Sequence, residues 1–311
     1  MLTTLLLTLA LADDPKPDAA DPPAKQPTEQ PAEQAAEQAT EQPAEQPAEK
    51  PAEKPEDAEK PEDAGDLFAD DALRQVIRET LKQKSRPSEA IKKDDLATIY
   101  FLRAPGRGIQ SLDGLEHCPN LSLVDLSDNA ITSAAPLQDR RRLQSIDLSG
   151  NRLDSTDPFG KIPAIQYLNL EGNRLTSLDG LAPLENLRSL TVSGNQITSL
   201  DPLVSCGKLQ SLWASGNQLT SIDPLTQLPA VDTLDLAGNP ITSLDPLGGR
   251  DNLRLLMLAK TPITSLGPII ATGKEQPLFL RIYLDSGQIE SLKGDVETLR
   301  EMNVRVEAIE Q

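Results

Sequence analysis

One asparagine-centred phrase recurs at a constant step along the middle of this chain of 311 residues. It reads GNRLTSLD, GNQITSLD, GNQLTSID and GNPITSLD in successive copies, which begin 22 residues apart. Counting at the same step, the asparagines are Asn129, Asn151, Asn173, Asn195, Asn217 and Asn239. A fixed period of this length predicts a solenoid, in which each repeat buries its apolar face against the next repeat.

Apolar residues keep nearly constant offsets from this asparagine. Around Asn195 they are Leu187, Leu190, Val192, Ile197, Leu200 and Leu203. The residues before the asparagine alternate in the manner of a short strand, and those after it bring the chain back toward the core. The pattern therefore predicts an α/β repeat fold in which stacked units share one continuous core.

These residues match L-x-x-L-x-L-x-x-N-x-[IL]-x-x-[IL], and the chain resembles leucine-rich repeat proteins of the 22-residue class. That class includes the bacterial internalins and the repeat regulatory subunit of protein phosphatase 1. The match covers roughly residues 99–292 in about nine units, with Arg107, Thr261 and Gly287 where the asparagine has changed. The resemblance implies a leucine-rich repeat solenoid with a curved parallel sheet on its concave face and short helical or 3-10 turns on its convex side. It also implies end caps at residues 66–98 and 293–311, the first similar to the internalin cap.

The repeated phrase is interpreted as scaffold. An asparagine at the bend after each strand both accepts and donates hydrogen bonds, and so satisfies backbone groups of a buried turn. Glycines permit tight backbone geometry just before it. They are Gly150, Gly172, Gly194, Gly216 and Gly238. Asp-Pro pairs in the returning arm are typical of a cap residue followed by a proline in the first turn of a helix. These pairs begin at Asp201, Asp223 and Asp245.

The segments that flank the repeats predict elements that close the core. Residues 67–84 place apolar side chains at helical spacing, followed by a short turn over 91–99 and a first strand over 100–104. The last repeat arrives four residues late, which predicts a bulging loop at 273–278. Residues 290–309 predict a final helix and a terminal strand.

The first 65 residues differ in composition from the rest. Residues 1–12 are apolar and end in Ala-Leu-Ala, which predicts a short signal peptide rather than a membrane span. Residues 13–65 carry sixteen Asp or Glu against five Lys and are rich in Pro and Ala, which predicts a disordered acidic linker. We therefore expect an exported protein, in the periplasm, at the cell surface or secreted, with a cytoplasmic protein as the alternative. The net charge of −18 also argues against nucleic-acid binding.

Candidates for catalysis are few, and we expect no enzymatic activity. His117 precedes Cys118, but both Cys118 and Cys206 fall on core positions of their repeats and are expected to be buried and unreactive. Strands four repeats apart lie about 20 Å from one another, so no disulfide between these two cysteines is expected. No motif predicts a metal or cofactor site.

Side chains on the outer side of the predicted sheet form columns at fixed offsets from the asparagine. The middle column, four residues before it, reads Arg103, Asp125, Asp147, Asn169, Thr191, Trp213, Asp235, Met257 and Tyr283. The outer column, six residues before it, reads Phe101, Leu123, Ser145, Tyr167, Ser189, Ser211, Thr233, Leu255 and Arg281. Aromatic and apolar residues of the two columns gather toward the C-terminal half of this face, as in a binding hot spot. The predicted partner-binding residues are Tyr167, Trp213, Asp235, Leu255, Met257 and Tyr283.

Asp125 and Asp147 form a like-charge pair on adjacent strands, interpreted as a solvated patch with Arg103 as the neighbour able to relieve it. An alternative is that the pair receives a cationic side chain of a partner. The predicted function is an exported, non-catalytic scaffold that binds an unidentified protein on its concave face. The alternative is an intracellular regulatory subunit that docks on an enzyme such as a protein phosphatase.

Overall fold

The computed structural model describes residues 67–84, 91–275 and 279–309. These residues lie within one compact unit, Asp57–Gln311. The predicted signal peptide at 1–12 and the predicted linker at 13–65 lie outside the described residues.

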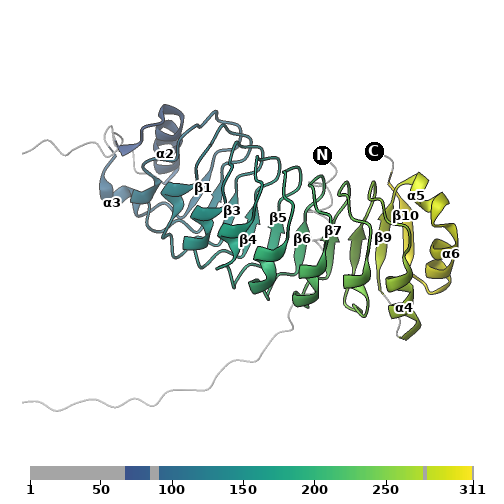
Figure 1. Ribbon diagram of the computed structural model, residues 1–311. Helices are drawn as coiled ribbons and strands as arrows, with labels where there is room; N and C mark the ends of the chain where they lie inside the picture. Colours follow the sequence, from purple (N-terminus) through teal and green to yellow (C-terminus); the bar gives the residue numbers. More distant parts are fainter. Residues whose placement is uncertain (1–66, 85–90, 276–278, 310–311) are drawn as a thin grey trace, which may run out of the picture. The chain divides into compact units, whose positions relative to one another are not determined.

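The unit is built on one sheet of ten parallel strands, and each strand pairs with the next strand in sequence (Figure 1). The strands are β1 (Phe101–Arg103), β2 (Leu123–Asp125), β3 (Ser145–Asp147), β4 (Tyr167–Asn169), β5 (Ser189–Thr191), β6 (Ser211–Trp213), β7 (Thr233–Asp235), β8 (Leu255–Met257), β9 (Arg281–Leu284) and β10 (Arg305–Ala308). The predicted fold class, a leucine-rich repeat solenoid, is confirmed by this topology.

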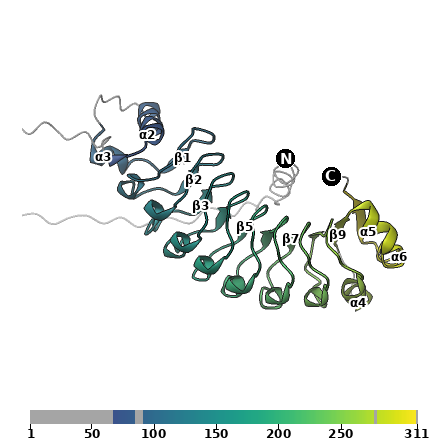
Figure 2. The same cartoon turned by 45° about the horizontal axis from the view of Figure 1, so that its top comes forward.

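Short 3-10 helices connect most of the strands and lie on the outer side of the curved sheet (Figure 2). They are η2 (Leu115–His117), η3 (Ala135–Leu137), η4 (Asp157–Lys161), η5 (Asp179–Leu181), η6 (Asp201–Ser205), η7 (Asp223–Gln227) and η8 (Asp245–Leu247). The sheet therefore forms the concave face of the repeats, and the 3-10 helices form the convex side.

The 22-residue step places equivalent residues directly opposite one another on neighbouring strands. Leu190 of β5, for example, pairs with Leu168 of β4 and Leu212 of β6. All three side chains point into a continuous apolar core and are at most 2% exposed. The core positions predicted around Asn195 are buried as well.

The repeated asparagine ties each repeat to the one before it. Asn195 Nδ2 donates to the carbonyl oxygens of Val192, Ser193 and Leu170 at 2.9, 3.2 and 3.0 Å. Its Oδ1 accepts from the backbone N–H of Leu175 at 3.0 Å. Asn151, Asn173, Asn217 and Asn239 repeat this arrangement, and Asn129 makes a similar set. The prediction that this side chain both accepts and donates is confirmed.

The glycine before the asparagine adopts a left-handed backbone conformation. Gly194 has φ +66°, and the other four predicted glycines have φ between +64° and +67°. Asp128 and Lys260 occupy the equivalent position in two less regular repeats, with φ of 57° and 59°. The turn therefore keeps its conformation even where a side chain makes it less favourable.

The prediction that the Asp-Pro pairs begin with a helix cap is wrong. Asp201 is the first residue inside η6, and the capping position belongs to Leu200, whose side chain makes no capping hydrogen bond. The preceding serine takes that role, since Ser199 Oγ accepts from the Asp201 N–H at 3.0 Å. A serine hydroxyl can bond the backbone two residues on, which explains the invariant serine of the repeated phrase.

The N-terminal cap consists of α2 (Asp71–Gln83) and α3 (Lys93–Leu96), which confirms the predicted helix and short turn. Asp70 caps α2 by accepting from the Leu73 N–H at 2.9 Å. Its second carboxylate oxygen accepts from the Gln110 N–H at 2.8 Å and thereby fastens the cap to the first repeat. The apolar side of α2 is buried through Leu73, Val76, Ile77 and Leu81.

The C-terminal end differs from the prediction in two details. Residues 273–275 of the predicted loop belong to a helix, α4 (Gly267–Glu275), while residues 276–278 lie outside the described residues. The last turn is satisfied by Gln288 and not by its neighbour Gly287, since Gln288 Nε2 donates to the Leu258 and Thr261 carbonyl oxygens at 2.8 and 2.7 Å. Gly287 has no side-chain amide that could replace that of the asparagine.

The final elements are α5 (Ser286–Ser291), α6 (Lys293–Glu301) and β10, in agreement with the predicted closing helix and strand. Asp285 caps α5 and also accepts from the Lys260 N–H at 2.8 Å. None of the helices in the described ranges combines the length and the apolar character needed to cross a membrane.

Candidate binding face on the concave side of the sheet

All six predicted partner-binding residues lie on the side of the sheet opposite the core. Tyr167 comes from β4, Trp213 from β6, Asp235 from β7, Leu255 and Met257 from β8, and Tyr283 from β9. The register aligns the members of each column on neighbouring strands, so the predicted columns exist. The strands therefore bring these side chains onto one face.

Their exposure differs from the prediction. Tyr167 is 48% exposed, while Leu255 and Tyr283 are partly buried. Trp213, Asp235 and Met257 retain only 1, 2 and 5% of their accessible surface. The expectation of an exposed apolar group in the C-terminal half is therefore wrong for Trp213 and Met257.

Crowding between neighbouring strands accounts for part of this burial. Trp213 lies between Thr191 on β5 and Asp235 on β7, and Met257 follows Asp235 on β8. Parallel strands are only about 4.8 Å apart, and side chains on a concave surface converge. Trp213 and Met257 stand outside the continuous core cluster, and Trp213 Nε1 has no hydrogen-bond partner among the described residues.

Asp235 carries the unusual electrostatics of this face. Burial raises the pKa of its carboxyl group to about 6, although hydrogen bonds from the Ala237 N–H and from Ser215 oppose the shift. The Ala237 N–H lies 3.0 Å from Asp235 Oδ1. The carboxylate is therefore ionised at neutral pH at a cost that its few donors do not offset.

Asp125 and Asp147 are partly relieved, but not by Arg103. Asp147 accepts from Ser149 Oγ at 2.6 Å and from Asn169 Nδ2 at 3.0 Å, and Asp125 accepts from Ser127 Oγ at 2.9 Å. In the part of the chain that the structure describes, no ion pair joins Arg103 to Asp125. Hydroxyl and amide donors from the sheet itself therefore replace the expected cation.

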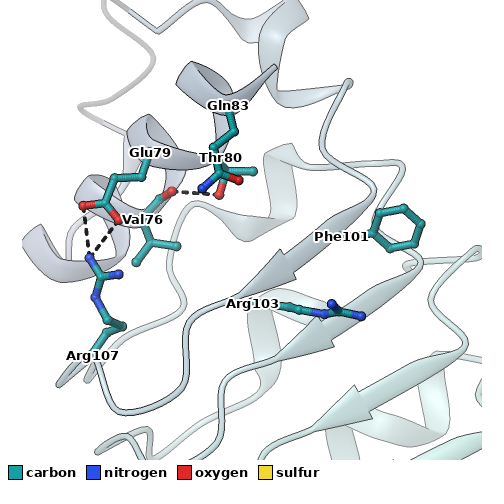
Figure 3. Close-up of a pocket in the computed structure, with 7 residues that line it drawn as sticks. All are labelled: Val76, Glu79, Thr80, Gln83, Phe101, Arg103 and Arg107. Carbon is teal, nitrogen blue, oxygen red and sulfur yellow. Dashed lines mark hydrogen bonds and ion pairs between the residues drawn. The ribbon is translucent and has the colours of Figure 1, made fainter. Parts of the chain in front are cut away.

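The sequence interpretation did not include the N-terminal end of the concave face among the binding residues. Phe101 is 60% exposed, and Arg103 is exposed beside it on β1. Both line a cavity of about 500 Å³ between β1 and α2 (Figure 3). Their places in the two columns were readable from the sequence, whereas the cavity depends on how the cap helix docks.

The two cysteines lie at core positions of their repeats. Cys118 and Cys206 are free and fully buried, and burial raises the pKa of their thiols to about 12 and about 11. Thiols with raised pKa values are poor nucleophiles at neutral pH. Within residues 67–84, 91–275 and 279–309, no group of three or more His, Cys, Asp or Glu side chains is placed to hold a metal ion.

Comparisons with known proteins agree with this architecture. A family described as "Leucine rich repeat" matches residues 141–197, and one described as "Leucine Rich repeats (2 copies)" matches residues 207–249. Among solved structures, internalin C2 of Listeria monocytogenes is 28% identical, with a TM-score of 0.67 over 74% of this chain and 99% of the internalin chain.

A more distant likeness comes from Toll of Drosophila, solved in the Toll–Spatzle complex. It is 24% identical, with a TM-score of 0.53 over 60% of this chain and 28% of the Toll chain, and shows the fold alone. The repeats, their 22-residue step and the internalin C2 match lead to one conclusion: the chain is an internalin-like leucine-rich repeat protein.

Proposed function

We propose that this protein is an exported, non-catalytic scaffold that presents its concave face to a partner protein. The observation that carries the proposal is the register, which gathers Tyr167, Trp213, Asp235, Leu255, Met257 and Tyr283 from five strands onto one face. Tyrosine and tryptophan are enriched at protein interfaces because they combine apolar area with a polar group.

The rigidity of the sheet supports a binding role. Each strand is hydrogen-bonded to its neighbours, and the asparagine in the bend after the strand bonds the backbone of that bend. The side chains of the concave face are therefore held in place before a partner binds. Preorganisation lowers the entropy lost on binding. Leucine-rich repeat proteins and internalin-like relatives are protein-binding scaffolds in general.

Within the proposed face, the residues have different roles. Tyr167 and the partly buried Leu255 and Tyr283 supply contact area. Trp213, Asp235 and Met257 supply the underlying support that fixes the shape of the surface between them. Substitution of Tyr167 and Tyr283, rather than of the three buried residues, is therefore the cleaner test of contact.

The decisive experiment compares partner recovery by two double variants of the full chain. Tyr167→Ala/Tyr283→Ala removes aromatic area from the concave face, whereas Lys161→Ala/Gln227→Ala removes exposed side chains from η4 and η7 on the convex side. Each variant is used to capture proteins from the source organism, and the amounts are quantified against the wild type.

We expect the concave variant to lose most of the specific partner, because loss of two interface tyrosines typically costs several kcal/mol in total, about 2 for each hot-spot residue. The convex variant should retain it. Equal recovery by the two variants would refute the concave face as the binding site.

Export rests on residues 1–12 and 13–65 and is tested separately. Cell fractionation, together with N-terminal sequencing of the mature protein, should find the chain outside the cytoplasm and without its first residues. A cytoplasmic protein that begins at Met1 would favour the alternative, a regulatory subunit that docks on an intracellular enzyme.

A further inference from the structure

The cavity between α2 and β1 is distinct from the face proposed above. One stripe of α2 faces it, with Val76, Thr80 and Gln83 on successive turns. Phe101 and Arg103 project into it from β1, the edge strand of the sheet. Figure 3 shows the α2 side chains on one side of the view and Phe101 and Arg103 beside the strand on the other.

The lining is partly apolar. Of the two apolar side chains in the lining, Val76 on α2 is 3% exposed and Phe101 on β1 is 60% exposed. An exposed phenylalanine next to a concave opening offers a large area for an apolar side chain of a ligand. The opening therefore favours a ligand with an apolar group.

The rest of the lining is cationic. Arg107 Nη2 lies 2.9 and 3.1 Å from the two carboxylate oxygens of Glu79, so this arginine is already engaged by α2. Arg103 is exposed, and among the described residues it makes no ion pair and no side-chain hydrogen bond. Two guanidinium groups against one carboxylate leave the lining positive in a chain whose net charge is −18.

An opposing charge outside the cavity is Asp125, which pairs with Arg103 in the register of β1 and β2. Its Oδ1 is held by the hydroxyl and N–H of Ser127, at 2.9 and 3.3 Å. The guanidinium of Arg103 consequently remains available to a carboxylate from outside, with planar donors suited to a bidentate contact.

We propose that this cavity binds an acidic peptide segment of a partner protein, with an apolar side chain against Phe101 and Val76 and a flanking carboxylate on Arg103. The charge complementarity of Arg103 and the exposed Phe101 carry the proposal. It does not depend on the concave residues of β4 to β9, and either site can exist without the other.

The test is fluorescence anisotropy of the full chain with labelled synthetic peptides at low ionic strength. The probe is a nonapeptide centred on Glu-Phe-Glu. The matched peptides Gln-Phe-Gln and Glu-Gly-Glu lack the charges and the apolar group, respectively. We expect only the first peptide to bind well, and its binding to weaken with added salt.

Variants of the protein locate the site. Arg103→Ala should weaken binding about tenfold, as expected for loss of one charge-assisted hydrogen-bonded pair, with partial recovery in Arg103→Lys. Phe101→Ala should weaken it by about threefold to tenfold. The matched control Arg174→Ala removes an exposed arginine from a turn of another repeat and should change nothing.

Glu79→Gln has the opposite expected effect. It removes the negative charge of the described lining and weakens the hold on Arg107, so binding of Glu-Phe-Glu should become about twofold tighter. Thermal unfolding of every variant checks that the cap remains folded, which is expected because Phe101, Arg103 and Glu79 are not part of the core.

Three outcomes would overturn the proposal: no binding of Glu-Phe-Glu to the wild type, equal binding of Gln-Phe-Gln, or equal effects of Arg103→Ala and Arg174→Ala. A carboxylated polysaccharide, polygalacturonate, serves as a probe of a different class. Arg103-dependent binding of this polymer without binding of the peptide would replace the proposed partner. Tyr167→Ala/Tyr283→Ala should leave peptide binding intact, so failure of this site and failure of the concave site are distinguishable.

Discussion

The asparagine ladder and the middle column of the concave face use the same repeats in opposite ways. The ladder keeps asparagine in six consecutive repeats, and five of the six side chains are buried and bound to equivalent backbone groups. The middle column changes chemistry almost at every strand, from Arg103 through Asn169 to Trp213 and Met257. The buried backbone groups of the turn require one residue type, whereas the face opposite the core accepts side chains of different chemistry that can serve function.

Removing one amide from the ladder should have the largest effect on stability. Asn195→Ala leaves the buried Leu175 N–H without its partner and removes one of two donors from each of three carbonyl oxygens, so the free energy of unfolding should fall by about 2–4 kcal/mol. Urea unfolding followed by circular dichroism measures the loss.

The matched control is Asn169→Ala on the concave face. Asn169 is partly buried and makes one bond to Asp147 and one to the Glu171 N–H, so about 1 kcal/mol is expected. Similar losses in the two variants would remove the distinction between ladder and face.

A smaller effect should come from the buried carboxylate of Asp235. Its pKa of about 6 in the folded protein exceeds the ordinary value of 3.8, so the folded state keeps a proton that the unfolded state releases between these pH values. Stability should therefore fall as the pH rises from about 4 to 6, by at most about 3 kcal/mol. Asp235→Asn should abolish this fall and stabilise the protein at pH 7.

Denaturant titrations at a series of pH values, with Asp125→Asn as the matched substitution in the same column, check this expectation. The Asp125 variant should keep the pH dependence of the wild type. An unchanged profile for Asp235→Asn would show that Asp235 is not the responsible group.

The left-handed turn position offers a reciprocal pair of substitutions. Gly194→Ala meets no atom closer than 3.6 Å, so its expected cost of about 1 kcal/mol comes from the backbone conformation alone. Lys260→Gly should have the opposite sign and gain up to about 1 kcal/mol, because Lys260 already has φ 59°. Melting temperatures of the two variants test the pair, and a gain from Gly194→Ala would contradict it.

The smallest effect on stability should come from the exposed part of the face. Tyr167→Ala removes a side chain that is 48% exposed and lies outside the core, so the change should remain within about 0.5 kcal/mol. Partner recovery should nevertheless decrease. A large loss of stability would show that Tyr167 supports the scaffold.

The repeat architecture was predictable from the sequence because the 22-residue period fixes the register once one strand is placed. Leu187, Leu190 and Val192 locate β5 to within a residue, and the neighbouring strands follow at the same step. The two buried cysteines followed from the same register. These features depend on interactions within one repeat or between adjacent repeats.

Features that depend on several repeats at once were harder to predict. Burial of Trp213 depends on the size of its cross-strand neighbours and on curvature, which no single repeat encodes. In the last repeat the amide donor is Gln288, which lies in α5, whereas the earlier repeats have a turn at this place. The cavity beside Phe101 depends on the docking of α2, which involves residues of both cap and repeat.

The carboxylates of Asp70 and Asp285 fasten the two ends of the array to backbone N–H groups of the adjacent repeats. Burial alone would raise the pKa of each carboxyl group, but the backbone hydrogen bonds outweigh it and lower both pKa values. Their contribution is present above the ordinary pKa and is lost as acid protonates them, the reverse of Asp235. Since each repeat of a solenoid is held only by its neighbours, acid should destabilise this array first at its two ends, whereas protonation of Asp235 removes the cost of a buried charge on β7.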